Sequence, residues 1–200
     1  MPAALRRSLM VVAAALIASA INPHDYFTWF LEVVPALVVY LILLLSYQHF
    51  ALSPLLYWLI AAHACVLAVG GHYTYAEVPL FDWIKDALHQ SRNNYDKLGH
   101  FMQGFVPAIA ARELLLRRSP LKRGKWLIYI VISICLAFSA FYELIEWWVA
   151  AASGDSAEAF LGTQGYVWDT QSDMMMALIG AVTALITLSR FHDQQLSKFT

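Results

Sequence analysis

The sequence predicts an all-α membrane protein, a polytopic bundle of six transmembrane helices in one integral membrane domain over residues 1–200. Hydrophobic residues make up 60% of the chain and charged residues only 14%, against about 25% in soluble domains. The mean hydropathy is +0.57. The apolar residues form runs close to the roughly 20 residues that cross about 30 Å of hydrocarbon. This composition excludes an ordinary soluble domain.

Six apolar runs supply the predicted spans. We expect these spans at residues 5–21, 27–47, 52–71, 98–116, 126–152 and 173–189. The first run follows two arginines and ends in small residues, as signal peptides do, but further apolar runs follow at once. We therefore expect an uncleaved first helix. Residues 80–89 predict a short amphipathic helix that lies at the membrane interface.

The basic residues predict the orientation of the bundle. With the amino terminus inside, the cytoplasmic segments hold nine basic residues: Arg6, Arg7, Arg117, Arg118, Lys122, Arg123, Lys125, Arg190 and Lys198. The outer segments hold three, Lys85, Arg92 and Lys97. This bias follows the positive-inside rule, so both termini of this multi-pass protein are expected to be cytoplasmic.

Acidic, histidine and neighbouring polar residues occur on the outer side of four predicted spans. In chain order they are His72, Tyr73, Asp96, His100, Gln103, Glu143, Glu146, Asp169 and Asp173. Within the last three of these spans they recur three or four positions apart, so they share one helical face. An ionised carboxylate at mid-membrane costs about 2.5–3.5 kcal/mol. Such acids persist only when they are paired, protonated, hydrated or bound to a metal.

Carboxylates beside an imidazole suit a divalent ion such as Zn, Mn or Mg. The expected metal ligands are His100, Glu143, Asp173 and Asp169. The expected general base is Glu146 or Asp96. A bound ion would make hydroxide near neutral pH, directed at a phosphoryl or acyl group in the outer leaflet. This hypothesis is a divalent-metal-dependent hydrolase or transferase that acts on a lipid-linked or envelope substrate, with no nucleic-acid partner.

Two other functions use the same residues. Intramembrane acids near a histidine also occur in proton- or ion-coupled transporters and channels. A non-catalytic assembly or lipid-binding protein would use its buried acids only to fix helix packing. Asp96 and Asp169 also suit helix amino termini, and Glu32 and Glu113 are expected to snorkel or to pair structurally. A stoichiometric divalent ion would separate the first hypothesis from the others.

Several motifs carry a resemblance to known families; they lie at residues 71–75, 95–100, 142–147 and 162–174. On these segments the chain resembles the bacterial inner-membrane YjdF family, to which no biochemical function is assigned. The resemblance implies an inner-membrane location and gives weight to the motif residues, Gln164 among them. More distantly, Asp-Lys-x-x-His-Phe at residues 96–101 is similar to VanZ-like membrane proteins, which are linked to glycopeptide tolerance. The asparagine that closes the VanZ-like pattern is replaced here by methionines at residues 174–176.

Overall fold

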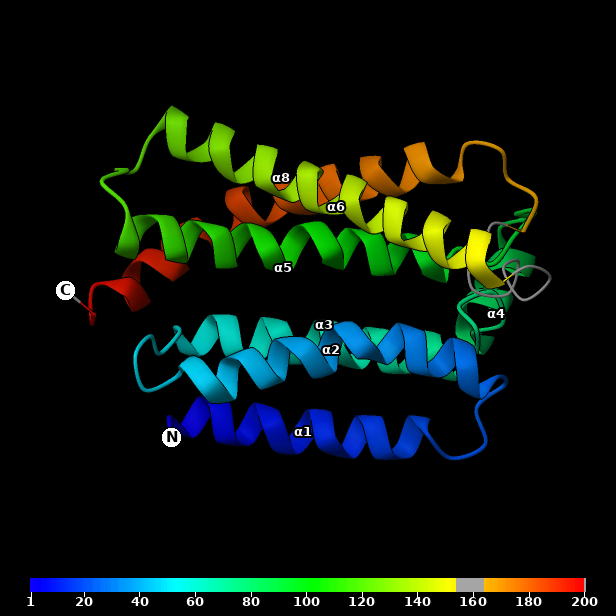
Figure 1. Cartoon of the computed structure of the whole chain (residues 1–200). Helices are drawn as coiled ribbons and strands as arrows, with labels where there is room; N and C mark the ends of the chain where they lie inside the picture. Colours follow the sequence, from blue (N-terminus) through cyan, green and yellow to red (C-terminus); the bar gives the residue numbers. More distant parts are fainter. Residues whose placement is uncertain (154–163, 200) are drawn as a thin grey trace.

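The computed structural model describes residues 1–153 and 164–199, which form seven helices and no strand. In chain order the helices are α1 (Ala3–Ser19), α2 (Tyr26–Ser46), α3 (Pro54–His72), α4 (Pro79–Ala87), α5 (Tyr95–Arg118), α6 (Lys125–Ser153) and α8 (Asp169–Leu196). The long helices alternate in direction, so the bundle has two ends (Figure 1). This arrangement confirms the predicted all-α class, with a helix at each of the six apolar runs.

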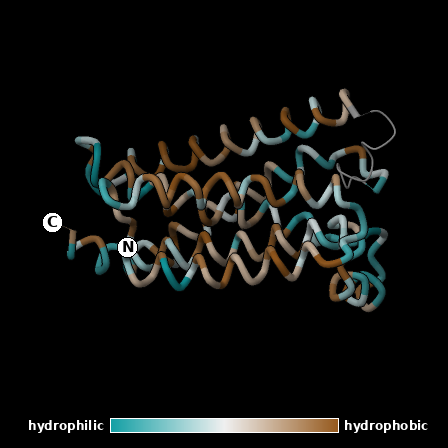
Figure 2. Tube along the Cα trace, turned by 60° about the horizontal axis from the view of Figure 1, so that its bottom comes forward, coloured by the Kyte–Doolittle hydropathy of each residue, from teal (hydrophilic) through white to brown (hydrophobic). Residues whose placement is uncertain are grey.

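Four helices in the described part of the chain are long and apolar enough to cross a membrane: α2, α3, α6 and α8. The other two predicted spans, α1 and α5, do not meet these requirements of length and apolar composition, each for a different reason. Helix α1 has only 17 residues. Helix α5 is longer but carries polar and charged residues along its length, many of them buried within the bundle. Along the bundle, hydrophobic residues concentrate in the middle and hydrophilic residues at the two ends (Figure 2).

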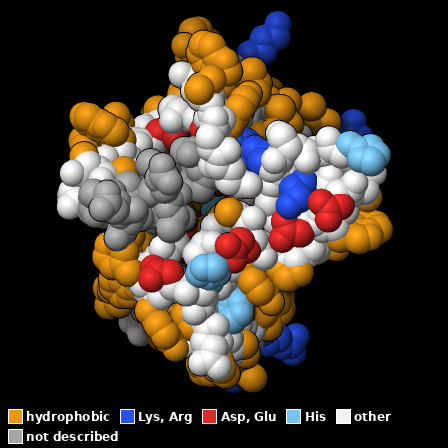
Figure 3. All heavy atoms as spheres, turned by 90° about the vertical axis from the view of Figure 1, so that its right-hand side faces the viewer, with side chains coloured by type: hydrophobic (Ala, Val, Ile, Leu, Met, Phe, Trp, Pro, Cys, Tyr) orange, Lys and Arg blue, Asp and Glu red, His pale blue; other side chains and the backbone are white. Residues whose placement is uncertain are grey.

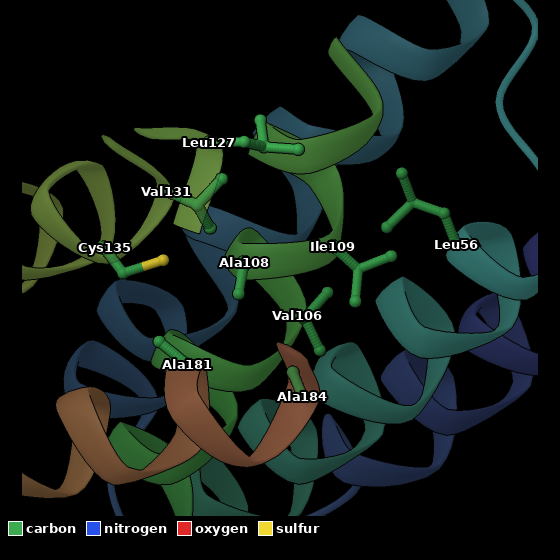
Figure 4. Packing of buried hydrophobic residues seen from close by; sticks show 9 residues of the cluster. All are labelled: Leu56, Val106, Ala108, Ile109, Leu127, Val131, Cys135, Ala181 and Ala184. Carbon is green, nitrogen blue, oxygen red and sulfur yellow. The ribbon is translucent and has the colours of Figure 1, made fainter. Parts of the chain in front are cut away.

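The long helices pack as two groups of three (Figure 1). In one group α3 packs against α1 and α2, and in the other α5 packs against α6 and α8. Contacts between α3 and α5 join the two groups. At this junction Leu56, Ile109, Val131 and Ala181 come from four different helices and are completely buried (Figure 4). Burial of each large side chain contributes about 1.5–3 kcal/mol.

Helices α5 and α8 approach so closely that their backbones touch. A Cβ atom on Gly104 would overlap the backbone oxygen of Ala177, and one on Gly180 would overlap that of Phe101. Glycine and alanine permit this approach because they place little or no side chain between the two helices. The small-residue stripe of α8 therefore faces into the bundle, as its periodicity predicts.

The end of the bundle that holds both chain termini, here called the basic end, contains a buried ionic network. Glu113 of α5 accepts hydrogen bonds from the backbone N–H of Ser53 at 2.9 Å and from Arg117 Nη1 at 2.7 Å. Its other oxygen accepts from His192 Nε2 at 2.9 Å. Arg112 Nη1 donates to His192 Nδ1 at 2.9 Å, which selects the Nε2–H tautomer, because a guanidinium can only donate. The pairing expected for Glu113 is confirmed, with Arg117 as its partner.

The opposite end, here called the acidic end, holds the amino termini of α2, α5 and α8 and the short helix α4. Leu80, Trp83 and Leu88 are exposed around α4. This exposure is what an interfacial amphipathic helix requires, so the predicted short helix is confirmed.

Two acids at this end lie outside the long helices and have shifted pKa values. Asp25 caps α2, and its Oδ2 accepts a hydrogen bond from the backbone N–H of Thr28 at 2.6 Å. That bond lowers the pKa of Asp25, because it stabilises the ionised carboxylate. The hydrogen bond from Lys85 lowers the pKa of Asp82 in the same way.

Candidate acidic and histidine site

Helices α5, α6 and α8 bring the predicted acids and His100 together at the acidic end. The described residues contain two groups of possible metal ligands, and within each group the ligand atoms lie within 4.8 Å of one another. His100 belongs to both groups. The first group is Asp96, His100 and Asp173, and the second is His100, Glu143 and Glu146. The surface of this end carries acidic, basic and histidine side chains with hydrophobic ones near its edge (Figure 3), whereas Asp96, His100, Glu143 and Asp173 are buried beneath it.

The first group is paired with cations. Lys97 Nζ lies 2.5 Å from Asp173 Oδ1, 2.7 Å from Asp169 Oδ1 and 3.5 Å from Asp96 Oδ2. Arg92 Nη1 lies 2.5 Å from Asp169 Oδ1, and its Nη2 lies 3.5 Å from Asp96 Oδ2. Asp169, predicted as a metal ligand, is therefore placed between two cations. This half of the site is a local network of ion pairs.

The second group has no such partner. Neither Glu143 nor Glu146 forms an ion pair with a lysine or arginine of residues 1–153 or 164–199. Glu143 is 9% exposed. Its Oε1 is buried without a hydrogen-bond partner among the described residues. An unsatisfied buried polar atom costs about 1–3 kcal/mol, and more when it is charged.

His100 joins the two halves through its two ring nitrogens. Nε2 lies 3.2 Å from Asp96 Oδ1, while Nδ1 lies 3.0 Å from Gln103 Oε1 and 3.7 Å from Glu143 Oε1. An Nε2–H that donates to Asp96 leaves the Nδ1 lone pair directed toward Gln103 and Glu143. A carboxylate that orients a histidine in this way is typical of metal sites.

A cavity of about 370 Å³ borders this site between α2, α3, α5 and α6. Its wall includes Glu32, Tyr75, His100 and Glu146. Thr74 and Tyr75 have φ values of +50° and +56°, a left-handed turn that is uncommon for residues other than glycine. The turn places the Tyr75 ring against Gly70 and Gly99, where any Cβ would crowd it. The strained turn at the end of α3 thus forms part of the cavity wall.

Five of the predicted site residues lie outside these two groups: His72, Tyr73, Gln103, Gln164 and Asp169. His72 Nδ1 donates to the backbone oxygen of Ser19 at 2.9 Å, which ties α3 to α1. The Tyr73 ring packs edge-on against the His72 ring. Gln164 exchanges two hydrogen bonds with the backbone of Asn93, at 3.0 and 2.9 Å. Gln164 therefore holds the segment before α8 against the segment before α5, next to Arg92.

The structure also brings in residues that sequence reasoning did not assign to the site. Arg92 and Lys97 pair with the acids of α5 and α8, and Glu32, Tyr75 and Tyr142 line the cavity. A signal for the two cations was present in the sequence, because they are two of only three basic residues expected on the outer side. Tyr75 belongs to the motif at residues 71–75, but its place in the cavity wall depends on the turn after α3.

A family model described as predicted membrane protein (DUF2238) matches residues 4–194. The chain belongs to this family. The inner membrane protein YjdF of Escherichia coli (strain K12), to which the chain is similar, is 50% identical over 198 residues, covering 99% of this chain and 95% of the relative. No solved structure matches the chain. This DUF2238 member is an integral protein of the inner membrane, embedded in the lipid bilayer through several apolar helices.

Proposed function

We propose that this protein is a divalent-metal-dependent membrane enzyme, a hydrolase or transferase that acts on a lipid-linked envelope substrate. The observation that carries the proposal is the buried Oε1 of Glu143, which has no hydrogen-bond partner among the described residues and lies 3.7 Å from His100 Nδ1. Two carboxylates without a cation are costly in a membrane interior, and a divalent ion would compensate both. Imidazole nitrogens and carboxylate oxygens are both zinc ligands, and catalytic zinc sites use three protein ligands with one position left open.

The contacts favour a division of roles within the site. His100 Nδ1, Glu143 and Glu146 would hold the ion, and Asp96 would orient the imidazole through Nε2. Gln103 Oε1 lies 3.0 Å from His100 Nδ1, so it would either become a further ligand of the ion or be displaced when the ion binds. Asp169 and Asp173, which are held by Lys97, would fix the geometry between α5 and α8. A divalent ion there supplies a hydroxide nucleophile near neutral pH.

We also propose that α1 and α5 cross the membrane with the four more apolar helices, giving six spans with both termini cytoplasmic. Support comes from the alternating directions of the helices and from the position of both termini at the basic end (Figure 1). The ionic groups of α5 do not oppose this placement, because Arg112 and Glu113 are paired inside the bundle. The acidic end would then face the periplasm.

One observation favours a second candidate function. Both ring nitrogens of His100 face acceptor oxygens, Asp96 Oδ1 and Gln103 Oε1, and this geometry also suits an imidazolium. An imidazolium between two acidic groups is the arrangement expected of a proton-coupled transporter or channel. A protein of that kind would need no metal, so metal binding distinguishes the two functions.

The test measures metal on the purified full-length protein in detergent. The protein is stripped with a chelator and then titrated with Zn²⁺, Mn²⁺ and Mg²⁺ by calorimetry, and bound metal is counted by mass spectrometry. We expect one equivalent of one ion in the wild type, and at least about tenfold weaker binding in Glu143→Gln and Glu146→Gln. Asp173→Asn is the matched control, because it removes an acid that Lys97 already neutralises.

The outcomes are distinct. Binding that survives in Asp173→Asn and fails in the two glutamate variants supports the assigned ligands. The reverse pattern moves the ion to the other group and overturns the assignment. Absence of any stoichiometric ion overturns the enzyme proposal. A wild type that instead takes up protons, with a pH dependence abolished by His100→Gln, supports the transporter.

A further inference from the structure

The cavity beside His100 is long and follows one face of α5. Seven positions of α5 line it, from Asp96 to Ala110, and they recur three or four residues apart. Those 14 steps correspond to about 21 Å along the helix axis. Helices α2, α3 and α6 form the remaining walls over two to three turns each. The cavity therefore extends from the acidic end to the middle of the bundle.

The polar groups of the wall are concentrated at one end of this cavity. Glu32, Asp96, His100 and Glu146 line it at the acidic end. Toward the middle of the bundle the wall becomes apolar, with Ile60, Val106, Pro107, Ala110 and Phe138. His63 is the single ionisable side chain in the deeper wall among the described residues. The cavity is thus amphipathic along its length.

We place the mouth of the cavity between α2 and α6. Three lining residues from these helices have exposed side chains: Val38 at 48%, Val39 at 37% and Phe138 at 50%. Both helices are long and apolar enough to cross the membrane. An apolar rim on such helices faces hydrocarbon, so lipid chains and not water lie outside this mouth.

We propose that this cavity binds one hydrocarbon chain of a membrane lipid, which enters sideways between α2 and α6 and places the polar linkage of that lipid beside His100 and Glu146. The volume of about 370 Å³ lies at the low end of the roughly 300–1,000 Å³ typical of ligand pockets. A space of that size accepts one chain and excludes a whole two-chain lipid. That this lipid is the substrate rests on the proposed metal-dependent function; the chain-binding step does not.

The test uses the full-length protein in vesicles of phosphatidylethanolamine and phosphatidylglycerol. A small fraction of a phospholipid carrying a diazirine in one acyl chain is added, and light-induced labelling is mapped by mass spectrometry. We expect labels on α5 and α6 residues of the cavity. Val38→Trp, which places a large ring at the mouth, should reduce this labelling about tenfold.

Leu37→Trp is the matched control. Leu37 is the neighbouring residue on α2 and is 45% exposed, but it does not line the cavity. Both side chains face the surface, so neither change disturbs the core. Equal loss of labelling in the two variants, or labels confined to outward-facing residues, would overturn the proposal. Ala110→Phe provides a second variant, which fills the deep end and should shift labels toward the mouth.

The two proposals fail in different ways. Glu146→Gln should lose metal and keep the labelling of the cavity, whereas Val38→Trp should keep metal and lose the labelling. A protein that binds no ion but is labelled in the cavity would overturn the proposed enzyme and leave the chain site standing. A protein that binds the ion but is labelled only on its outer surface would overturn the chain site and leave the proposed enzyme standing.

Discussion

Both ends of the bundle bury a glutamate close to a histidine, and the surroundings of the two pairs differ. At the basic end Glu113 is fully buried, and its two oxygens receive three hydrogen bonds. At the acidic end Glu143 is almost as buried, but its Oε1 receives none from the described residues. His192 lies between a donor and an acceptor, whereas His100 has acceptors on both sides.

Charge balance separates the ends in the same way. Asp193 at the basic end pairs with Arg112 at 2.6 Å and with Arg123 at 2.9 Å, so the acids there are matched by arginines. At the acidic end Lys97 and Arg92 form ion pairs with three aspartates. The two glutamates of α6 lie near His100 instead. A fully hydrogen-bonded network stabilises one structure, whereas a buried polar group without a partner calls for an explanation such as a bound ion or a catalytic role.

The largest effect on stability is expected from a substitution in the hydrogen-bonded network around Glu113 at the basic end. Glu113→Gln places an amide N–H against a donor and removes the charge that Arg117 and His192 share. Loss of one partner from a buried ion pair costs about 3–5 kcal/mol, so the midpoint of thermal unfolding in detergent should fall sharply. Glu77→Gln is the control, because its exposed pair with His24 is worth at most about 1 kcal/mol. Similar unfolding midpoints for Glu113→Gln and Glu77→Gln would show that the buried network of the basic end does not stabilise the fold as proposed.

A smaller effect of opposite sign is expected at the acidic end. Glu143→Gln removes a charge that pairs with no lysine or arginine of the described residues, so the metal-free protein should become more stable by about 1 kcal/mol. Asp173→Asn, in contrast, should be destabilising, because it removes one of the three aspartates that pair with Lys97. Chemical unfolding in mixed micelles, after treatment with a chelator, measures both. A loss of stability in Glu143→Gln would mean that this carboxylate is satisfied in the native protein.

The smallest effect concerns a local contact at the acidic end. Asp25→Ala removes the amino-terminal cap of α2 and should cost about 1 kcal/mol at neutral pH. The folded pKa of Asp25 lies below its ordinary value of 3.8, so the contribution is present above that value and is lost as the pH falls through the lowered pKa. The gap between variant and wild type, measured by thermal unfolding from pH 7 to pH 3, should therefore narrow with acid. Asp86→Ala, an exposed acid of α4, should show no gap at any pH.

Helix positions and the inward direction of the acids follow from local patterns. Apolar runs and three-to-four-residue spacing predicted α2, α3, α6 and the buried faces of Asp173 and Glu143, because these patterns depend only on the residues within one helix. Pairing between helices depends on side-chain rotation and depth, which periodicity does not specify. For this reason Lys97 was not expected to hold three aspartates, and His72 was expected near a site that it does not reach.

The close backbone contacts of Gly104 with Ala177 and of Gly180 with Phe101 restrict how the molecule can move. Two helices that pack without intervening side chains resist sliding and rotation against each other, so α5 and α8 hold Asp96, Lys97 and Asp173 together. A lipid chain that enters the cavity from the bilayer would then be admitted by tilting of α2, α3 or α6, the other helices that line it. Because α6 carries Glu143 and Glu146, a tilt of α6 would change their distance from His100. Entry of the lipid chain would then change the geometry of the three proposed metal ligands.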